Sequence, residues 1–371
     1  MKIGILTLPL HTNYGGILQA YALQTVLERM GYEVTVFDTP KKIKVFTWRL
    51  PIMVLGRCIA KFLLGRQSYI LTEVWHNKTY PIVSRYTQAF IDKYINRLEL
   101  ADISALSKNE YDILIVGSDQ IWRPVYYTHI ENAFLSFARE WDVKRIAYAA
   151  SFGTDKWEYS EKQTQLCGSL LQLFDVVTVR EQSGISLCQK HFNVMAQHVL
   201  DPTMLLESAD YIKLIEVSNI SKSEGDMLCY ILDETEEKSN FISRIAAHKG
   251  MKMFRVNSRI EDKFAPLEER IQPPVEFWLR GFYDAKFVIT DSFHACVFAI
   301  LFQKPFLVIG NRERGLARFE SLLSLFDLED RLVFLDKESH SHEREIDWKD
   351  VLKKLSDERT RSLNLLKKGL V

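Results

Sequence analysis

Cysteine is scarce in this sequence. The 371 residues include five cysteines, which are scattered along the chain and never form a C-x-x-C pair: Cys58, Cys167, Cys188, Cys229 and Cys296. An odd number of isolated cysteines excludes a disulfide framework and a cysteine-based zinc site. The pattern favours free thiols in a reducing compartment.

Long apolar runs are also missing. The sequence has no stretch of 18 apolar residues, so it predicts no membrane-spanning helix. Its first 16 residues contain only a short apolar run broken by polar residues. This run predicts a first β-strand rather than a signal peptide. We therefore expect a cytoplasmic protein, either free or peripheral at the inner face of the membrane.

The chain has no excess of charge of either sign. Lys and Arg total 48, Asp and Glu total 48, and the formal net charge is +0. A neutral chain is a poor candidate for dedicated nucleic-acid binding. No cluster of residues predicts a metal site, because His340-Ser341-His342 is typical of a solvated loop. We expect neither a metal nor a cofactor.

The first strand is followed by a loop that lacks the dinucleotide signature G-x-G-x-x-G. Residues 2–6 and 32–37 predict strands on either side of a helix, which makes a βαβ unit. The loop before the helix carries His11, Asn13, Tyr14, Gly15 and Gly16. It is either a ligand loop at a helix N-terminus or a tight turn that needs glycine. Asp38 ends the second strand where a ribose-binding acid would lie, although such a residue more often belongs to a turn.

Three further strands of the first half end in residues suited to ligand binding. The strand over 111–116 precedes Asp119 and Gln120, which could bind sugar hydroxyls, and Trp122, which could stack on a sugar or lie in the core.

The next two strands end in small or basic residues. The strand over 144–149 precedes Ser151 and Gly153, which let backbone N–H groups approach a ligand closely. The strand over 176–179 precedes Arg180. Its guanidinium could hold a carboxylate or phosphate at two points, or it could pair with the neighbouring Glu181 at the surface.

The second half repeats the alternation of strands and helices. Residues 227–232 and 251–256 predict strands, and 234–248 and 274–283 predict helices. The stretch 287–309 then predicts a strand, a turn, a helix and a strand.

This last turn carries the best candidates for chemistry. Asp291 or Ser292 would cap the helix, and His294 would lie in its first turn. Free N–H groups at a helix start, beside a histidine and a carboxylate, can hold an anion and move a proton.

The alternation predicts an α/β protein with two Rossmann-like, doubly wound domains that face each other across a cleft. The length of 371 residues also suits two domains. We place the N-terminal domain at 1–215 and the C-terminal domain at 216–340. Residues 341–371 predict a helix that packs back on the protein.

Residues 41–100 interrupt this alternation as an insert. Seven basic residues lie among large apolar ones at its start: Lys41, Lys42, Lys44, Arg49, Arg57, Lys61 and Arg66. The mixture suits a helix on an anionic membrane surface, or a helical pair packed on the domain with extended basic side chains. The membrane alternative would fit an enzyme that acts on lipid-linked saccharides.

Taken together, the motifs at the strand ends resemble those of the polysaccharide pyruvyl transferase family. The matching segments are Asn13-Tyr14-Gly15-Gly16 with Leu18-Gln19-Ala20-Tyr21, Gly117-Ser118-Asp119-Gln120-Ile121-Trp122, Ala149-Ala150-Ser151-Phe152-Gly153, Val179-Arg180-Glu181-Gln182-Ser183, Leu200-Asp201-Pro202-Thr203 and Thr290-Asp291-Ser292-Phe293-His294-Ala295. Each motif alone is weak, but their order and spacing fit over roughly residues 2–330.

The resemblance implies a fold like that of GT-B glycosyltransferases. It implies transfer of pyruvate from phosphoenolpyruvate to two hydroxyls of a sugar, which forms a cyclic ketal. The histidine of the last motif would be catalytic, here His294, and Arg180 would contact the donor. From the turn itself we also assign Asp291 to catalysis. The N-terminal domain would hold the acceptor and the C-terminal domain the donor.

The candidate site residues divide between the two substrates. For the donor we assign Arg180, Ser292, Arg314, Ser151 and Gly153. For the acceptor we assign Asn13, Tyr14, Gly15, Gly16, Asp119, Gln120 and Trp122. Ser292 departs from the family pattern, because several members carry an arginine two positions before the histidine. The missing charge would then come from Arg312, Arg314, Arg318 or Lys304.

Two other functions fit the same architecture. One is a nucleotide-sugar glycosyltransferase, which would bind UDP- or GDP-sugars. The other is a catalytically silent member that binds saccharide or scaffolds a polysaccharide-assembly complex. The expected partners are phosphoenolpyruvate and a saccharide acceptor, free or lipid-linked, but not nucleic acid. Membrane contact through residues 41–66 and self-association into a homo-oligomer both stay open.

Overall fold

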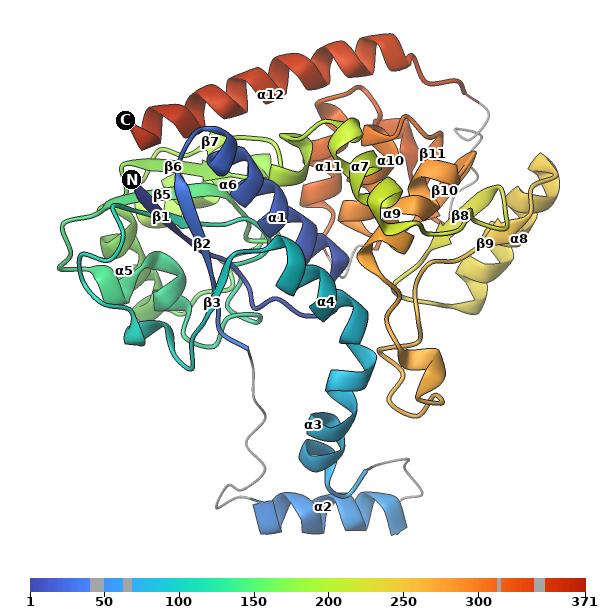
Figure 1. Cartoon of the computed structure of the whole chain (residues 1–371), viewed down its shortest axis with the longest axis horizontal. Coiled ribbons are helices and arrows are strands. Elements are labelled where there is room, and N and C mark those ends of the chain that lie inside the picture. Colours follow the sequence, from blue (N-terminus) through green and yellow to red (C-terminus); the bar gives the residue numbers. More distant parts are fainter. Residues whose placement is uncertain (41–49, 63–68, 312–314, 337–343) are drawn as a thin grey trace.

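The computed structural model describes residues 1–40, 50–62, 69–311, 315–336 and 344–371. These residues form two parallel sheets with helices around them, joined along a broad contact (Figure 1). The arrangement confirms the predicted α/β fold of two Rossmann-like domains in a GT-B-like pair.

The N-terminal sheet has seven parallel strands in the order β3-β2-β1-β4-β5-β6-β7. The strands are β1 (Lys2–Leu6), β2 (Glu33–Asp38), β3 (Arg97–Glu99), β4 (Ile113–Val116), β5 (Lys144–Ala150), β6 (Val176–Val179) and β7 (Gln197–His198). Its helices are α1 (Tyr14–Arg29), α5 (Glu161–Leu171) and α6 (Gln182–Leu187). This strand order is that of a Rossmann domain, in which ligands bind at the carboxyl ends of the strands.

The C-terminal sheet has five parallel strands in the order β12-β11-β10-β8-β9. The strands are β8 (Met227–Tyr230), β9 (Met253–Phe254), β10 (Phe287–Thr290), β11 (Phe306–Ile309) and β12 (Leu332–Val333). The helices of this part are α7 (Ser208–Ser218), α8 (Glu236–Lys249), α9 (Val275–Asp284), α10 (Phe293–Leu301) and α11 (Ala317–Ser324). Strands β8, β10 and β11 are buried along their whole length, and their sequences are therefore almost continuously apolar.

Side chains from both sheets share one hydrophobic core. The Tyr14 ring at the start of α1 stacks on Trp278 of α9, and the Tyr14 hydroxyl donates a hydrogen bond to the Pro273 carbonyl at 2.8 Å. Helix α7 packs against α9. These contacts hold the carboxyl ends of the two sheets against each other.

The last helix, α12 (Trp348–Leu370), runs back from the C-terminal sheet across the N-terminal one (Figure 1). Three of its residues bind the end of β7 and the segment that follows it. The Arg361 guanidinium donates to the His198 carbonyl at 2.8 Å, and the Arg359 guanidinium donates to the Met204 carbonyl at 2.8 Å. The Ser362 hydroxyl accepts from the Leu200 amide at 3.0 Å. Helix α12 therefore fixes the backbone on both sides of Asp201.

The insert contains α2 (Leu50–Phe62), α3 (Thr72–Val83) and α4 (Arg85–Tyr94). Helix α4 contacts α1 and α9, whereas α2 lies across the far end of α3, away from both sheets (Figure 1). Of the segment 41–66 that the sequence links to membrane contact, 41–49 and 63–66 lie outside the described residues. Within the described part of the chain, no helix combines the length and the apolar character needed to cross a bilayer.

Candidate active site

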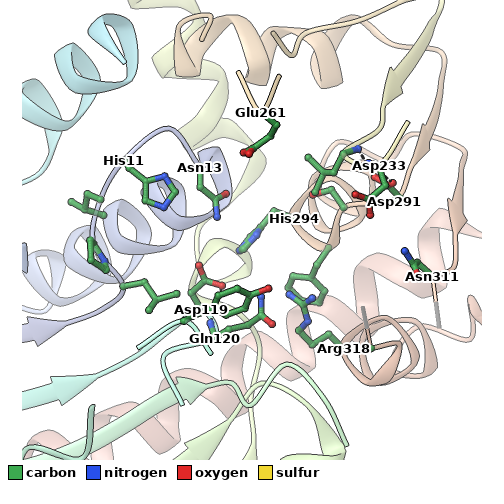
Figure 2. A pocket seen from close by; sticks show the side chains of 18 of the residues that line it. His11, Asn13, Asp119, Gln120, Asp233, Glu261, Asp291, His294, Asn311 and Arg318 are labelled. Atoms are coloured by element: carbon green, nitrogen blue, oxygen red, sulfur yellow. Dashed lines mark hydrogen bonds between the residues drawn. The ribbon is translucent and has the colours of Figure 1, made fainter. Parts of the chain in front are cut away.

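A cavity of about 610 Å³ lies between the carboxyl ends of the two sheets. Both domains and helix α3 of the insert line it. The lining residues are Leu8, Pro9, Leu10, His11, Asn13, Pro40, His76, Tyr80, Asp119, Gln120, Tyr126, Leu232, Asp233, Glu261, Asp291, Ser292, Phe293, His294, Asn311, Gly315, Arg318 and Phe319. Polar side chains from opposite walls point into it (Figure 2).

His294 lies in this cavity because the chain turns sharply from β10 into α10. The strand is apolar and buried, and the helix begins at Phe293 after Ser292 as its N-cap. The Ser292 hydroxyl makes no capping hydrogen bond to the helix, so the backbone N–H groups of the first turn stay available. A helix start of this kind attracts anions through its N–H groups and its dipole.

Asp201 is the carboxylate beside His294. Its Oδ1 accepts hydrogen bonds from the amide and the hydroxyl of Thr203, at 3.0 and 2.7 Å, which holds the side chain in one orientation. Its Oδ2 then lies 2.8 Å from an Arg180 guanidinium nitrogen and 3.5 Å from the His294 Nε2. Burial acts to raise the pKa of Asp201, but the nearby His294 and Arg180 hold that pKa far below its usual range. Asp201 is therefore ionised.

Asp291, the predicted partner of His294, has a different role. Its carboxylate accepts hydrogen bonds from the Leu232 and Asp233 amides at 2.7 and 3.1 Å, and it forms an ion pair with the Lys238 ammonium at 2.7 Å. These bonds tie the end of β8 to the end of β10. Asp291 lines the cavity, but Lys238 matches its charge, so the structure gives Asp291 a structural role rather than the predicted catalytic one.

Arg180 is also placed differently from the prediction. Its side chain is 1% exposed and bridges Asp201 at 2.8 Å and Asp119 at 3.5 Å. It does not line the cavity. The expectation that Arg180 grips the donor directly is wrong for this conformation, because two carboxylates already occupy its guanidinium. Arg180 instead lies behind His294 and balances the buried acids.

Arg318 of α11 is the arginine that lines the cavity (Figure 2). Its guanidinium lies over the Phe293 ring, 5.6 Å from the centroid, and its buried Nε has no hydrogen-bond partner. Among the described residues, no carboxylate lies within ion-pair distance of it. Burial, and then the neighbouring Arg180 charge, lower the pKa of Arg318 to about 10. A guanidinium in this setting gains from a bound anion.

Arg318 is one of four residues that the sequence offers in place of the missing family arginine. Lys304 is excluded from that role, because its ammonium donates to the Tyr283 carbonyl at 2.7 Å, outside the cavity. Arg312 and the predicted donor residue Arg314 lie outside the described residues.

The predicted acceptor residues lie partly in the cavity. Asn13, Asp119 and Gln120 line it, although the Asn13 Oδ1 also caps α1 by accepting from the Gly15 and Gly16 amides at 3.1 and 3.4 Å. Burial raises the pKa of Asp119, but the charges of Arg180 and then His294 lower it by a larger amount. The pKa therefore lies below its usual value, and the side chain is ionised.

Trp122 and Tyr14 belong to the core instead. The Trp122 ring is fully buried, stacks on Phe134 and donates from its indole nitrogen to the Ala133 carbonyl at 3.1 Å. The prediction that Trp122 stacks on a sugar is wrong, and the core alternative holds. Tyr14 is buried against Trp278 and joins the two domains, so it does not reach an acceptor in this conformation.

Ser151 and Gly153 form a tight loop behind the cavity rather than its surface. The Gly153 amide donates to the Ser151 hydroxyl and to the Glu181 carboxylate, both at 3.1 Å. Gly153 has a φ of +72°, and an added Cβ would lie 2.0 Å from the Gln120 Oε1. Gly153 is thus required by its left-handed backbone and by the lack of space for a Cβ beside Gln120. The predicted direct contact of Ser151 and Gly153 with the donor is not seen.

A metal or ribose site finds no support here. Within the described part of the chain, no group of three His, Cys, Asp or Glu residues could hold a metal ion. Asp38 is buried and accepts from the Leu10 amide at 3.1 Å and from the Arg97 guanidinium at 3.0 Å. It therefore has the structural role that the sequence left open.

The comparison with known families settles which family this is. The sequence profile described as polysaccharide pyruvyl transferase matches residues 13–313. The chain belongs to the polysaccharide pyruvyl transferase family. It is accordingly a transferase of polysaccharide biosynthesis. A search of curated proteins finds no match.

Solved structures similar to this pyruvyl transferase family member include several sugar-nucleotide proteins. One is a ugt transferase from Siraitia grosvenorii in complex with UDP, with a TM-score of 0.48, 9% identity and coverage of 100% of both chains. Another is UDP-GlcNAc 2-epimerase from Neisseria meningitidis bound to UDP-GlcNAc, with a TM-score of 0.46, 12% identity and coverage of 100% of this chain and 94% of that chain.

The pyruvyl transferase cavity also contains residues that sequence reasoning missed. His76 and Tyr80 come from the insert, Tyr126 follows the loop after β4, and Glu261 and Asn311 follow β9 and β11. Of these, Asn311 carried a usable signal, because it lies two residues after the buried parallel strand β11. The others lie in segments without a strand-end pattern.

Gly15 of the family motif Asn13-Tyr14-Gly15-Gly16 gives a testable prediction. A Cβ added at Gly15 would lie 2.0 Å from the His294 Nδ1, so alanine would push the imidazole away from its position. We expect Gly15→Ala to lower kcat by about 100-fold, because a shift of about 1 Å in a reacting group costs that much. Gly16→Ala is the matched control, since its nearest neighbour would be the Asp119 Oδ2 at 3.6 Å. Equal activities of the two variants would contradict this account.

Proposed function

We propose that this protein transfers pyruvate from phosphoenolpyruvate to two hydroxyls of a sugar, which forms a cyclic ketal and releases phosphate. The acceptor would be a unit of a surface polysaccharide or its lipid-linked precursor, modified in the cytoplasm. Family membership supports the reaction class. The observation that carries the proposal is the anion site formed by Arg318 and the uncapped start of α10, next to His294.

Phosphoenolpyruvate is a suitable ligand for such a site because it carries both a phosphate and a carboxylate. Arg318 lines the cavity and would hold one of these groups through its guanidinium. The N–H groups at the start of α10 would hold the other. Arg180 stays behind Asp201 and Asp119, so its positive charge does not crowd the reacting carbon.

The chemistry requires proton transfer at two stages. A proton added to C3 uses the C2=C3 π electrons and leaves a cation at C2, which the first sugar hydroxyl attacks. Phosphate then leaves with the electron pair of its bond to C2, and the second hydroxyl attacks in its place. Of the two hydroxyl protons, one balances the proton taken up at C3 and the other leaves with the phosphate.

His294 is the group that we assign to these transfers. Its Nε2 lies 3.5 Å from ionised Asp201, so a fixed carboxylate faces one edge of the ring. Asp201 and Asp119 also place negative charge near the cation that develops at C2. Such fixed charge stabilises a transition state without having to reorganise.

Other polar groups of the cavity suit a sugar. Asn13, Gln120 and Glu261 present amide and carboxylate groups to the cavity (Figure 2). These groups can donate to and accept from hydroxyls at several points. We assign them to the acceptor, with the N-terminal domain supplying most of its contacts.

Phosphate release from phosphoenolpyruvate tests the proposal. The assay would use free and diphospho-lipid-linked saccharides as acceptors, with ketal formation followed by mass spectrometry. We expect phosphate release that depends on an acceptor and a matching mass gain in that acceptor. Saturable binding of UDP- or GDP-sugars, with no phosphate release across a broad panel, would favour a glycosyltransferase and contradict the proposal.

Arg318→Met tests the donor site directly. Methionine keeps most of the side-chain volume but removes the charge. A hydrogen bond to a charged group is worth about 1.5–3 kcal/mol, so we expect the KM for phosphoenolpyruvate to rise by roughly 10- to 100-fold. Lys304→Met is the matched control, because Lys304 bonds to Tyr283 outside the cavity. A KM that is unchanged in Arg318→Met would remove Arg318 from the donor site.

A further inference from the structure

Helix α2 exposes a continuous apolar stripe. Ile52, Leu55 and Ile59 are 69%, 63% and 43% exposed, and at 3.6 residues per turn they lie on one face of the helix. Met53 beside them is also exposed. Among the described elements, none other carries as many exposed large apolar residues. An apolar patch of this kind marks a surface that binds another protein or a membrane.

The opposite face of α2 is anchored to the protein. The Arg57 guanidinium forms a two-point ion pair with the Glu73 carboxylate of α3, at 2.8 and 2.7 Å, and it also donates to the Ile70 carbonyl at 3.1 Å. Arg57 lies about 140° around the helix from Ile52. The apolar stripe therefore faces away from α3, at the outer end of the molecule (Figure 1).

The charge of this segment identifies the surface that would cover it. Between Asp38 and Glu73 the sequence contains no Asp or Glu, but besides Arg57, which pairs with Glu73, it contains six Lys and Arg residues in a chain whose net charge is +0. Apolar contact alone would suit a second copy of the chain, but like charges would then repel each other. An exposed apolar stripe in a segment of purely basic charge complements an anionic lipid bilayer.

We propose that α2 lies in the headgroup region of an anionic bilayer, with Ile52, Leu55 and Ile59 inserted among the acyl chains. The ion pair between Arg57 and Glu73 then fixes the angle between α2 and α3. Helix α3 becomes a spacer that holds the cavity at a set height above the membrane.

The spacer also indicates how an acceptor reaches the site. His76 and Tyr80 of α3 line the cavity one helical turn apart. At a rise of 1.5 Å per residue they lie roughly 6 and 12 Å along the helix from its start next to α2. The sugars of a lipid-linked saccharide would be at this height when the lipid is in the bilayer. This step rests on the proposed function, whereas the docking of α2 does not.

Vesicle sedimentation tests the docking. The wild-type protein would be mixed with vesicles of phosphatidylglycerol and phosphatidylcholine, or of phosphatidylcholine alone, at low and high salt. We expect sedimentation with the anionic vesicles that weakens at high salt. The triple variant Ile52→Glu, Leu55→Glu, Ile59→Glu should bind at least tenfold more weakly. Met195→Glu with Val217→Glu is the matched control, because both residues are exposed and lie outside the insert.

Three results would overturn the proposal. They are no sedimentation of the wild type at low salt, equal binding of the triple variant, and equal binding to neutral vesicles. A wild type that stays off vesicles but self-associates, with the triple variant monomeric in light scattering, would identify a second copy as the partner instead.

An activity assay separates the docking from the proposed function. The triple variant should keep its phosphate release with a soluble saccharide and lose it with the lipid-linked saccharide in vesicles. If the wild type releases no phosphate with any acceptor, the proposed function fails, but the sedimentation result still decides the docking.

Discussion

A His294→Ala variant should lose about 10²- to 10⁴-fold in kcat for phosphate release from phosphoenolpyruvate, because a positioned general acid or base contributes that much. His294 lines the cavity from the first turn of α10, and its Nε2 lies 3.5 Å from the Asp201 carboxylate. The KM for phosphoenolpyruvate should change far less, since Arg318 and the start of α10 remain. Steady-state kinetics with an active acceptor would measure both constants.

The control for this variant is His129→Ala. His129 is exposed and lies outside the cavity, so its loss should leave kcat unchanged. Thermal unfolding would establish that His294→Ala is folded, which is expected because alanine fits the start of a helix. A fully active His294→Ala variant would exclude the assigned proton transfer.

The position of His294 could be predicted because the signal is local. The apolar run before Asp291 and the helical run after Ser292 predict a strand and a helix, and the structure has β10 and α10 there. The two parallel sheets were predictable for the same reason, since each strand–helix pair has its own pattern. The insert broke that pattern and was recognisable as an insert.

The partners of His294 could not be predicted in this way. Asp291 lies three residues before His294, but the turn directs its carboxylate to Lys238 and the β8 loop. Asp201 lies 93 residues before His294, and only the packing of the two domains brings them together. The motif Leu200-Asp201-Pro202-Thr203 was visible in the sequence, but nothing in it reveals which other residues the carboxylate meets.

For the same reason, the sequence could not show whether Arg180 or Arg318 has a carboxylate partner. Both follow patterns that fit an anion site, and sequence cannot decide which one is already neutralised. In the structure Asp201 and Asp119 neutralise Arg180, and Arg318 keeps its charge for the cavity. Arg318, rather than Arg180, is therefore the arginine that we assign to the donor.

Arg180→Met should destabilise the protein by about 3–5 kcal/mol, because it leaves buried carboxylates without their partner. Arg180 is 1% exposed, and Asp201 beside it is fully buried. Urea unfolding would measure the free energy of unfolding. The double variant Arg180→Met, Asp201→Asn should lose less unfolding free energy than the two single variants lose together, because the amide at position 201 needs no counter-charge. The control is Arg29→Met, which breaks a half-exposed pair with Asp210 and should cost less than about 1 kcal/mol.

The difference in unfolding free energy between the wild type and Arg180→Met should be smaller in acid. In the wild type the pKa of Asp201 is depressed, so its contribution to stability is complete above about pH 4 and is lost as the pH falls below the ordinary carboxyl pKa. Without Arg180, burial is opposed by His294 alone, so the pKa of Asp201 lies above its wild-type value. The variant therefore takes up the proton that neutralises the unpaired charge at a higher pH than the wild type does. The difference in unfolding free energy should therefore be largest near neutral pH and smaller at pH 4. A difference that is constant over this range would mean that packing, rather than the Asp201 charge, is what Arg180 supports.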